Sequence, residues 1–133
     1  MDVCTVVRCA LVELGCAVDD RFPRSDRDFV VAISLSDIGQ LVIKLDESEI
    51  ALFSLLREFN AVWVRERAAD VAELLTRTYA WSRAGTISGR LCDEGLMLSA
   101  FLTRSSALDA KLFASAITEF HQCARGLLGK GSA

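Results

Sequence analysis

His121 and Cys123 have the residue types of a general base and a nucleophile, an imidazole near a thiol, and His121 is the only histidine in the chain. They lie two residues apart in a stretch with helical periodicity. Side chains two apart on a helix do not face each other, whereas a base must reach the proton that it removes. The spacing therefore predicts no catalytic pair here, and His121 is expected to be a surface or hydrogen-bonded histidine.

The chain has five cysteines, an odd number, and no two of them have the C-x-x-C spacing of a zinc or redox site. Cys9 and Cys16 are seven residues apart and share a helical face, where small core residues are expected. Zinc coordination and a structural disulfide remain alternatives, but a cytoplasmic location favours reduced, buried thiols. The other cysteines are Cys4, Cys92 and Cys123.

Two pairs of adjacent carboxylates, Asp19-Asp20 and Asp46-Glu47, lie in predicted turns without the pattern of a calcium loop. Phosphate-binding, dinucleotide-binding and serine-hydrolase motifs are absent from the sequence. We therefore expect a protein that is not an enzyme and that uses no cofactor and no metal. The alternative is an enzyme with a dispersed site around Cys92 or Cys123, which predicts a thiol that reacts rapidly in the native state.

Size and charge narrow the class of protein further. The 133 residues suggest a single domain over 1–133, and a net charge of −3 argues against general nucleic-acid binding. No run is long enough to cross a membrane, and no basic region precedes an apolar one at the start, so we expect a cytoplasmic protein without membrane insertion. Apolar residues make up 52% of the chain, an excess that indicates an apolar surface reserved for association.

Residues 29–56 organise the predicted fold. Their pattern predicts three short strands separated by polar breaks at 36–39 and 46–48. Phe29, Val31 and Ile33 fall on one side of the first strand, but Val30 and Ala32 on the other side are apolar too. A strand that is apolar on both faces needs cover on both, or it presents one face to a partner.

The remaining segments alternate between helices and strands. Helices are predicted over 3–16, over 68–83 and from a cap at Ser106-Asp109 to about Leu127, and strands over 86–92 and 96–103. Residues 61–64 fit either a short edge strand or the approach to a helix. The predicted fold is therefore α+β, in the order helix, three strands, helix, two strands, helix, with helices packed on a sheet that is antiparallel because its connections are short.

Four stretches resemble one known family, the InvB/SpaK-type class IB chaperones of type III secretion systems. Residues 6–16, VVRCALVELGC, are similar to the opening helix of that family, approximately L-V-R-x-A-L-x-x-x-G-C. Arg67-Ala68 with Val71 and Leu74 looks like the start of its second helix, and residues 95–100 look like its last strand. Phe113 to Phe120 resembles the Phe-x-x-Ala-(Leu/Ile)-x-x-Phe pattern of its final helix. The similarity spans nearly the whole chain and consists of packing patterns.

The resemblance implies an α+β homodimer in the bacterial cytoplasm that takes part in virulence. Such a chaperone binds the N-terminal segment of secreted effector proteins in a non-globular state, delivers them to the export apparatus and uses no nucleotide. The alternative is a non-catalytic adaptor or scaffold subunit that binds folded partners.

Apolar residues can be named for two expected contacts, one with an effector and one with a second copy of the chain. The expected effector-binding surface comes from the first helix and the three strands: Val7, Leu11, Val30, Phe53 and Leu55. The expected dimer interface comes from the second helix and its flank: Trp63, Leu75 and Tyr79. Each of these apolar residues also fits a role in the core.

Overall fold

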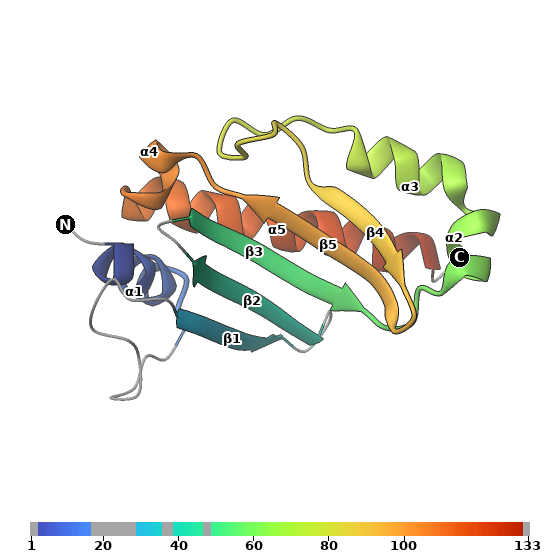
Figure 1. The fold of residues 1–133 in the computed structure, drawn as a ribbon, viewed down its shortest axis with the longest axis horizontal. Coiled ribbons are helices and arrows are strands. Elements are labelled where there is room, and N and C mark those ends of the chain that lie inside the picture. Colours follow the sequence, from blue (N-terminus) through green and yellow to red (C-terminus); the bar gives the residue numbers. More distant parts are fainter. Residues whose placement is uncertain (1–2, 17–28, 36–38, 47–48, 132–133) are drawn as a thin grey trace.

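The computed structural model describes residues 3–16, 29–35, 39–46 and 49–131 (Figure 1). The predicted connection over residues 17–28, with Asp19-Asp20, lies outside them, as does Glu47. The helices and strands, in chain order, are α1 Val3–Glu13, β1 Phe29–Leu35, β2 Gly39–Asp46, β3 Glu49–Leu56, α2 Ala61–Glu66, α3 Ala68–Leu75, β4 Ser88–Cys92, β5 Gly95–Phe101, α4 Arg104–Ala107 and α5 Ala110–Gly131.

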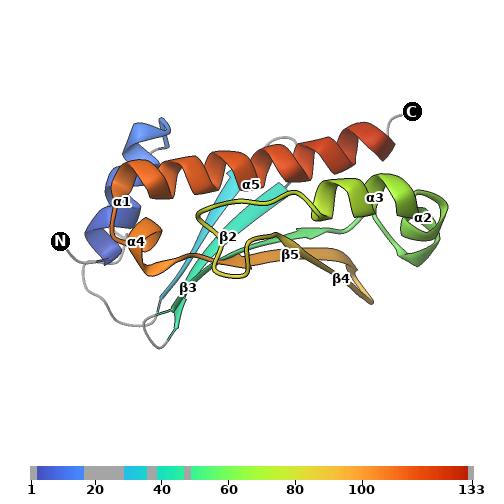
Figure 2. The same cartoon turned by 90° about the horizontal axis from the view of Figure 1, so that it is seen from above.

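The strands form one five-stranded antiparallel sheet in the order β1-β2-β3-β5-β4. The helices gather on one side of this sheet, and α5 runs across it (Figures 1 and 2). The α+β class, the antiparallel sheet and the packed helices are as the sequence predicts. The fold is therefore a two-layer structure with one sheet face covered by helices.

The core lies between the sheet and the helices. Alternate residues of each central strand point toward the helices, which makes Leu41, Ile43, Leu52 and Leu98 fully buried. Helix α5 contributes the other side of the core. Its buried side chains form a stripe that recurs with the helical period of about 3.6 residues. Its buried members are Phe113, Ala114, Ala116, Ile117, Phe120, Cys123, Ala124 and Leu127.

Helix α1 ends where a glycine permits a left-handed turn. Gly15 has a φ of 81°, its N–H bonds the carbonyl of Val12, and the N–H of Cys16 bonds the carbonyl of Leu11 at 2.9 Å. This pair of bonds is a Schellman motif, which satisfies carbonyls left over at the helix end. Cys9 is exposed on α1 and Cys16 is half-buried, so the expectation that both are core residues was wrong for Cys9.

Residues 61–66 form the short helix α2, so the edge-strand alternative is wrong. The side chain of Asn60 accepts a hydrogen bond from the N–H of Trp63 and caps this helix. The ring of Trp63 stacks on Phe59 at 3.9 Å between centroids, and the guanidinium of Arg67 lies over Trp63. These stacked side chains pin α2 to the end of β3.

The predicted helix over 68–83 was wrong in its second half, because α3 ends at Leu75. Residues 76–87 instead form an irregular loop whose backbone pairs with the end of β5. Arg83 N–H donates to the carbonyl of Phe101, and Thr103 N–H donates to the carbonyl of Trp81, both at 2.8 Å. Pairing with the sheet replaces the helical hydrogen bonds that the periodicity of this segment suggests.

The last helix begins later than predicted. Ser106 belongs to the short helix α4, whose cap is Thr103. Helix α5 is capped by Asp109, whose carboxylate accepts hydrogen bonds from the N–H groups of Lys111 and Leu112 at 2.9 and 3.1 Å. Asp109 is therefore the cap itself, and the expected capping box that starts at Ser106 was wrong.

Candidate functional site

The sheet surface that faces away from the helices, called the open face below, is the first candidate site. Strand alternation and register place every second residue of each strand on it. No helix of the described ranges covers it in either view of the ribbon (Figures 1 and 2). Its described residues are Val30, Ala32, Ser34, Gln40, Val42, Lys44, Asp46, Glu49, Ala51, Phe53, Leu55, Ser88, Arg90, Cys92, Gly95, Met97, Ser99 and Phe101.

The centre of the open face is apolar. Val42 pairs with Phe53 across β2 and β3, Leu55 pairs with Met97 across β3 and β5, and all four side chains are partly exposed. Val30 on the outer strand β1 is 62% exposed. Cross-strand neighbours on one face lie close enough to form a continuous surface. The open face therefore presents a band of apolar side chains to solvent.

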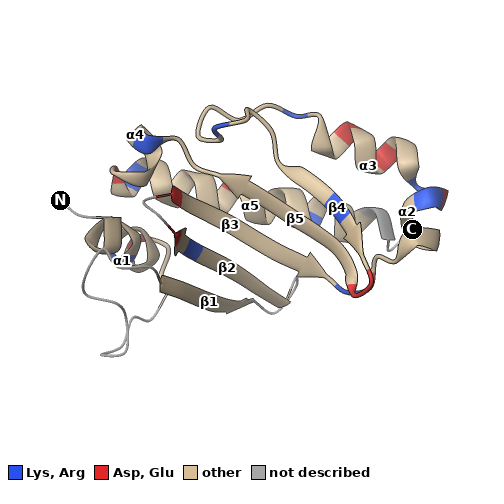
Figure 3. Ribbon diagram, in the orientation of Figure 1, with Lys and Arg blue, Asp and Glu red and all other residues tan. Residues whose placement is uncertain are grey.

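Charged groups border this band near the strand ends and on the outer strand β4, where Arg90 pairs with Met97 (Figure 3). Arg83 pairs with Glu49 at 2.6 Å and lies over the ring of Phe101, and Lys44 lies 3.9 Å from Asp46. The middle of β3 and of β5 carries no charged residue (Figure 3). An apolar centre with a polar border is the usual composition of a binding surface.

The structure brings together three of the five residues expected to contact an effector. Val30, Phe53 and Leu55 all lie on the open face. Val7 and Leu11 point from α1 into the core, where they are 0% and 3% exposed. Their burial leaves them no surface for a client, so the proposals below do not use them.

Two of the three residues expected in a dimer interface lie on α2 and α3, and α2 is at the end of the fold away from α1 (Figure 1). Trp63 and Leu75 are half-buried on α2 and α3. Leu75 packs closely on β4, where a Cβ added to Gly89 would lie 2.6 Å from its side chain. Leu91, on the same side of β4, is 43% exposed, so this edge of the molecule keeps an apolar surface.

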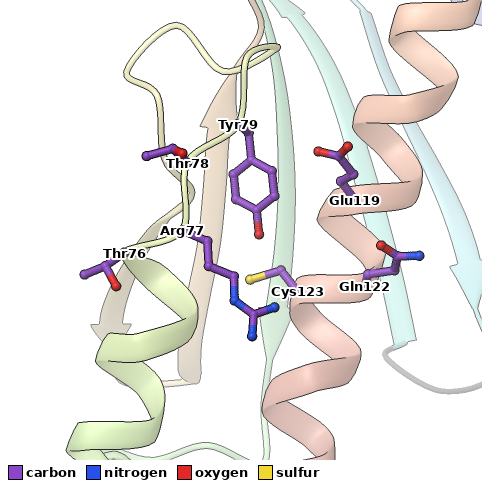
Figure 4. Close-up of a pocket in the computed structure, with 7 residues that line it drawn as sticks. All are labelled: Thr76, Arg77, Thr78, Tyr79, Glu119, Gln122 and Cys123. Carbon is purple, nitrogen blue, oxygen red and sulfur yellow. The ribbon is translucent and has the colours of Figure 1, made fainter.

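Tyr79 belongs to a second candidate site, called the cleft below. The cleft lies between helix α5 and the loop that follows α3 (Figure 4). Its volume is about 630 Å³. The Tyr79 ring descends into it with the hydroxyl toward the sulfur of Cys123 (Figure 4). The residues that line the cleft are Thr76, Arg77, Thr78, Tyr79, Glu119, Gln122 and Cys123.

Burial controls the protonation of the groups at the bottom of the cleft. It raises the pKa of the Cys123 thiol above its ordinary value of 9.0, and it raises the pKa of Tyr79 above 10.0 with help from the neighbouring Cys123. Both groups therefore stay neutral at neutral pH. Nucleophilic cysteines have a lowered pKa instead, so Cys123 has the character of a structural thiol.

Cys92, the other cysteine named for a dispersed catalytic site, is the last residue of β4. The thiol of Cys92 donates a hydrogen bond to the carbonyl of Gly95 at 3.3 Å. Within the ranges that the structure describes, no three His, Cys, Asp or Glu side chains are placed to hold a metal ion. None of the described helices is both long and apolar enough to span a membrane.

Sequence reasoning missed the cleft, because its walls are about 40 residues apart in the chain and no local motif connects them. Comparison with known proteins adds no assignment to either site. Neither a scan against protein-family models nor a search of curated proteins returns a match.

Proposed function

We propose that this protein is a type III secretion chaperone that binds the N-terminal segment of effector proteins in a non-globular state and delivers them to the export apparatus in the bacterial cytoplasm. The observation that supports the proposal most directly is the uncovered apolar band on the open face, which joins Val30, Phe53 and Leu55. The order of helices and strands is the one that the sequence patterns predict, with the short helices α2 and α4 added.

The outer strand β1 adds a second means of holding an extended client. It is the terminal strand of the sheet, so its outer backbone groups face no other described strand. Such an edge accepts a further strand through main-chain hydrogen bonds, while side chains on alternate positions contact the sheet face. A client strand beside β1 would lie next to Val30 on the open face.

The energetics favour a long contact path. Ordering an extended client costs about 1–2 kcal/mol per residue in backbone entropy. Burying one Leu-sized anchor contributes about 1.5–3 kcal/mol, and each added hydrogen bond about 0.5–1.5 kcal/mol. Because these terms nearly cancel for a short segment, useful affinity requires several anchors in succession. Two copies of the open face in a homodimer would provide such a path.

An adaptor that binds folded partners is the second candidate function. A sheet surface with an apolar centre and a polar border also fits a folded protein. The two functions differ in what they recognise. An adaptor keeps its partner after deletion of the partner's unstructured N-terminus, whereas a secretion chaperone loses it.

The test is to capture the protein from its native cytoplasm and digest the complex lightly with protease. The proposal expects a protected N-terminal fragment of a larger protein. The Val30→Glu/Phe53→Glu variant should lose that fragment while its circular dichroism is unchanged, because charges disrupt the apolar band. Leu112→Glu is the matched control, since Leu112 is 46% exposed on α5, away from the open face. A folded partner without a protected segment would identify an adaptor instead.

A further inference from the structure

The cleft between residues 76–79 and α5 has two firmly held walls. The loop that forms one wall is tied to α5 by the indole N–H of Trp81, which donates to the Glu119 carboxylate at 2.8 Å. Within the loop, Tyr79 N–H donates to the carbonyl of Gly85, and the Ser82 hydroxyl donates to the carbonyl of Thr86, both at 2.7 Å. Long loops that are held this tightly are usually functional.

The two charged groups of the cleft differ in what they already bind. Glu119 accepts the hydrogen bond from Trp81, which fixes its carboxylate at the α5 wall. Arg77 has no ion-pair partner within the described ranges, and its side chain crosses toward α5 with the guanidinium near Cys123 (Figure 4). The available charged group in the cleft is therefore a cation that carries several hydrogen-bond donors.

The hydroxyl of Tyr79 supplies one more donor. It is protonated at neutral pH because burial raises its pKa above 10.0, so it can donate a hydrogen bond to a ligand. Arg77 lies near enough to Tyr79 and Cys123 to favour their ionised forms, whereas Glu119 disfavours ionisation of Tyr79. A guanidinium and a hydroxyl on the lining of one cleft are donors from which a carboxylate can accept hydrogen bonds.

We propose that the cleft binds the carboxylate of an Asp or Glu side chain in an extended peptide, between the guanidinium of Arg77 and the hydroxyl of Tyr79. This inference rests on the proposed function, since the peptide would be part of the non-globular client. It adds a charged contact on the helix side of the molecule, separate from the apolar open face. The client is then selected for an acidic residue as well as for apolar anchors.

The test uses N-acetyl-glutamate amide as the ligand and N-acetyl-glutamine amide as its neutral match, added to the ¹⁵N-labelled protein. Trp81 reports on the cleft through its indole N–H, and Trp63, the other tryptophan, serves as an internal reference. The glutamate compound should shift the Trp81 signal to saturation, with a dissociation constant on the order of millimolar for so small a ligand. The glutamine compound should leave the Trp81 signal unchanged, and neither should move the Trp63 signal.

Substitutions of Arg77 and Tyr79 test whether these two side chains bind the glutamate compound. Arg77→Gln should weaken binding at least about tenfold, and Arg77→Lys should have an intermediate effect, because Lys keeps the charge without the planar fork. Tyr79→Phe should weaken binding severalfold. Arg65→Gln is the matched control, because Arg65 is an exposed arginine on the neighbouring helix α2. Equal shifts from both compounds, or equal loss in Arg77→Gln and Arg65→Gln, would overturn the inference.

Binding of the glutamate compound and protection of a client fragment are measured independently, so the carboxylate site and the proposed function can fail separately. If the glutamate compound does not bind but a client fragment is still protected from protease, only the cleft assignment fails. If the compound binds as expected but no client segment is protected, the chaperone proposal fails and the carboxylate site stands.

Discussion

Gly95 occupies a position that no other residue fits. Its φ is 143°, a conformation that side chains rarely adopt, and an added Cβ would overlap the main-chain carbonyl oxygen of Leu56. The glycine thus lets the β4–β5 turn pass close to the end of β3. The close approach to Leu56 was not predictable from the sequence, because the two residues lie about 40 positions apart in the chain.

We expect Gly95→Ala to lower the free energy of unfolding by about 2–3 kcal/mol, because both the backbone strain and the overlap act against the folded state. Denaturant unfolding measures the change. Gly129→Ala is the control, since no atom lies within 4 Å of the added Cβ. In the helix interior this control should be neutral or stabilising by about 0.5–1 kcal/mol. Equal effects of the two substitutions would contradict the assignment.

Cys123 predicts how stability depends on alkaline pH. Below its ordinary pKa of 9.0 the thiol is protonated in both the folded and the unfolded chain, so its burial does not make stability depend on pH. Above that pH the unfolded chain releases the proton while the folded chain holds it, because burial raises the pKa in the fold. The contribution of the neutral thiol to stability is therefore lost as pH rises through the folded pKa.

The comparison with Cys123→Ala isolates this effect. The variant should be less stable at neutral pH because of the cavity it leaves. The stability difference between the wild type and the variant should narrow as pH rises above about 9, since only the wild type carries the buried thiol. Chemical denaturation at a series of pH values measures this difference. A difference that stays constant would mean that burial does not shift the Cys123 pKa.

At the scale of elements, the cap of α5 determines how the longest helix begins. We expect Asp109→Ala to destabilise the protein by about 1 kcal/mol, because the N–H groups of Lys111 and Leu112 lose their acceptor. Asp109→Asn keeps a side-chain oxygen and should cost less. Thermal unfolding followed by circular dichroism compares the two. If both variants unfold like the wild type, Asp109 does not cap α5 in solution.

The sequence predicted most elements because their patterns are local. The pattern of residues 29–56 predicted three strands, the first of them apolar on both sides, and the apolar part of the open face is the consequence. The end of α3 was not predictable, because Tyr79 and Trp81 continue the helical spacing and only their contacts with α5 and the sheet end the helix. The cleft was missed for the same reason, since Arg77 and Cys123 meet only in the folded chain.

At the scale of the whole molecule, the proposed homodimer predicts a mass in solution of twice the 14.5 kDa of one chain. The interface that we propose lies on the side of α2, α3 and β4, with Trp63, Leu75 and the exposed Leu91. Leu91→Glu should return the mass to that of one chain, because a charge at the edge of an apolar contact must be desolvated. Light scattering after size exclusion measures both masses.

Leu112→Glu is the control for the homodimer, since Leu112 is 46% exposed on α5, slightly more than Leu91 at 43%. It should leave the dimer intact. Monomeric wild-type protein, or dissociation by both substitutions alike, would refute the proposed interface.

The position of α5 also has a consequence for synthesis on the ribosome. The helix packs on both α1 and the sheet, yet it follows all the other described elements in the chain. Likewise, β3 acquires its second neighbour only when β5 has been translated. The nascent chain therefore carries a sheet whose helix-facing side is incompletely covered until α5 has been translated, and the core cannot be completed before then. Products that terminate early, before α5, are expected to aggregate or be degraded.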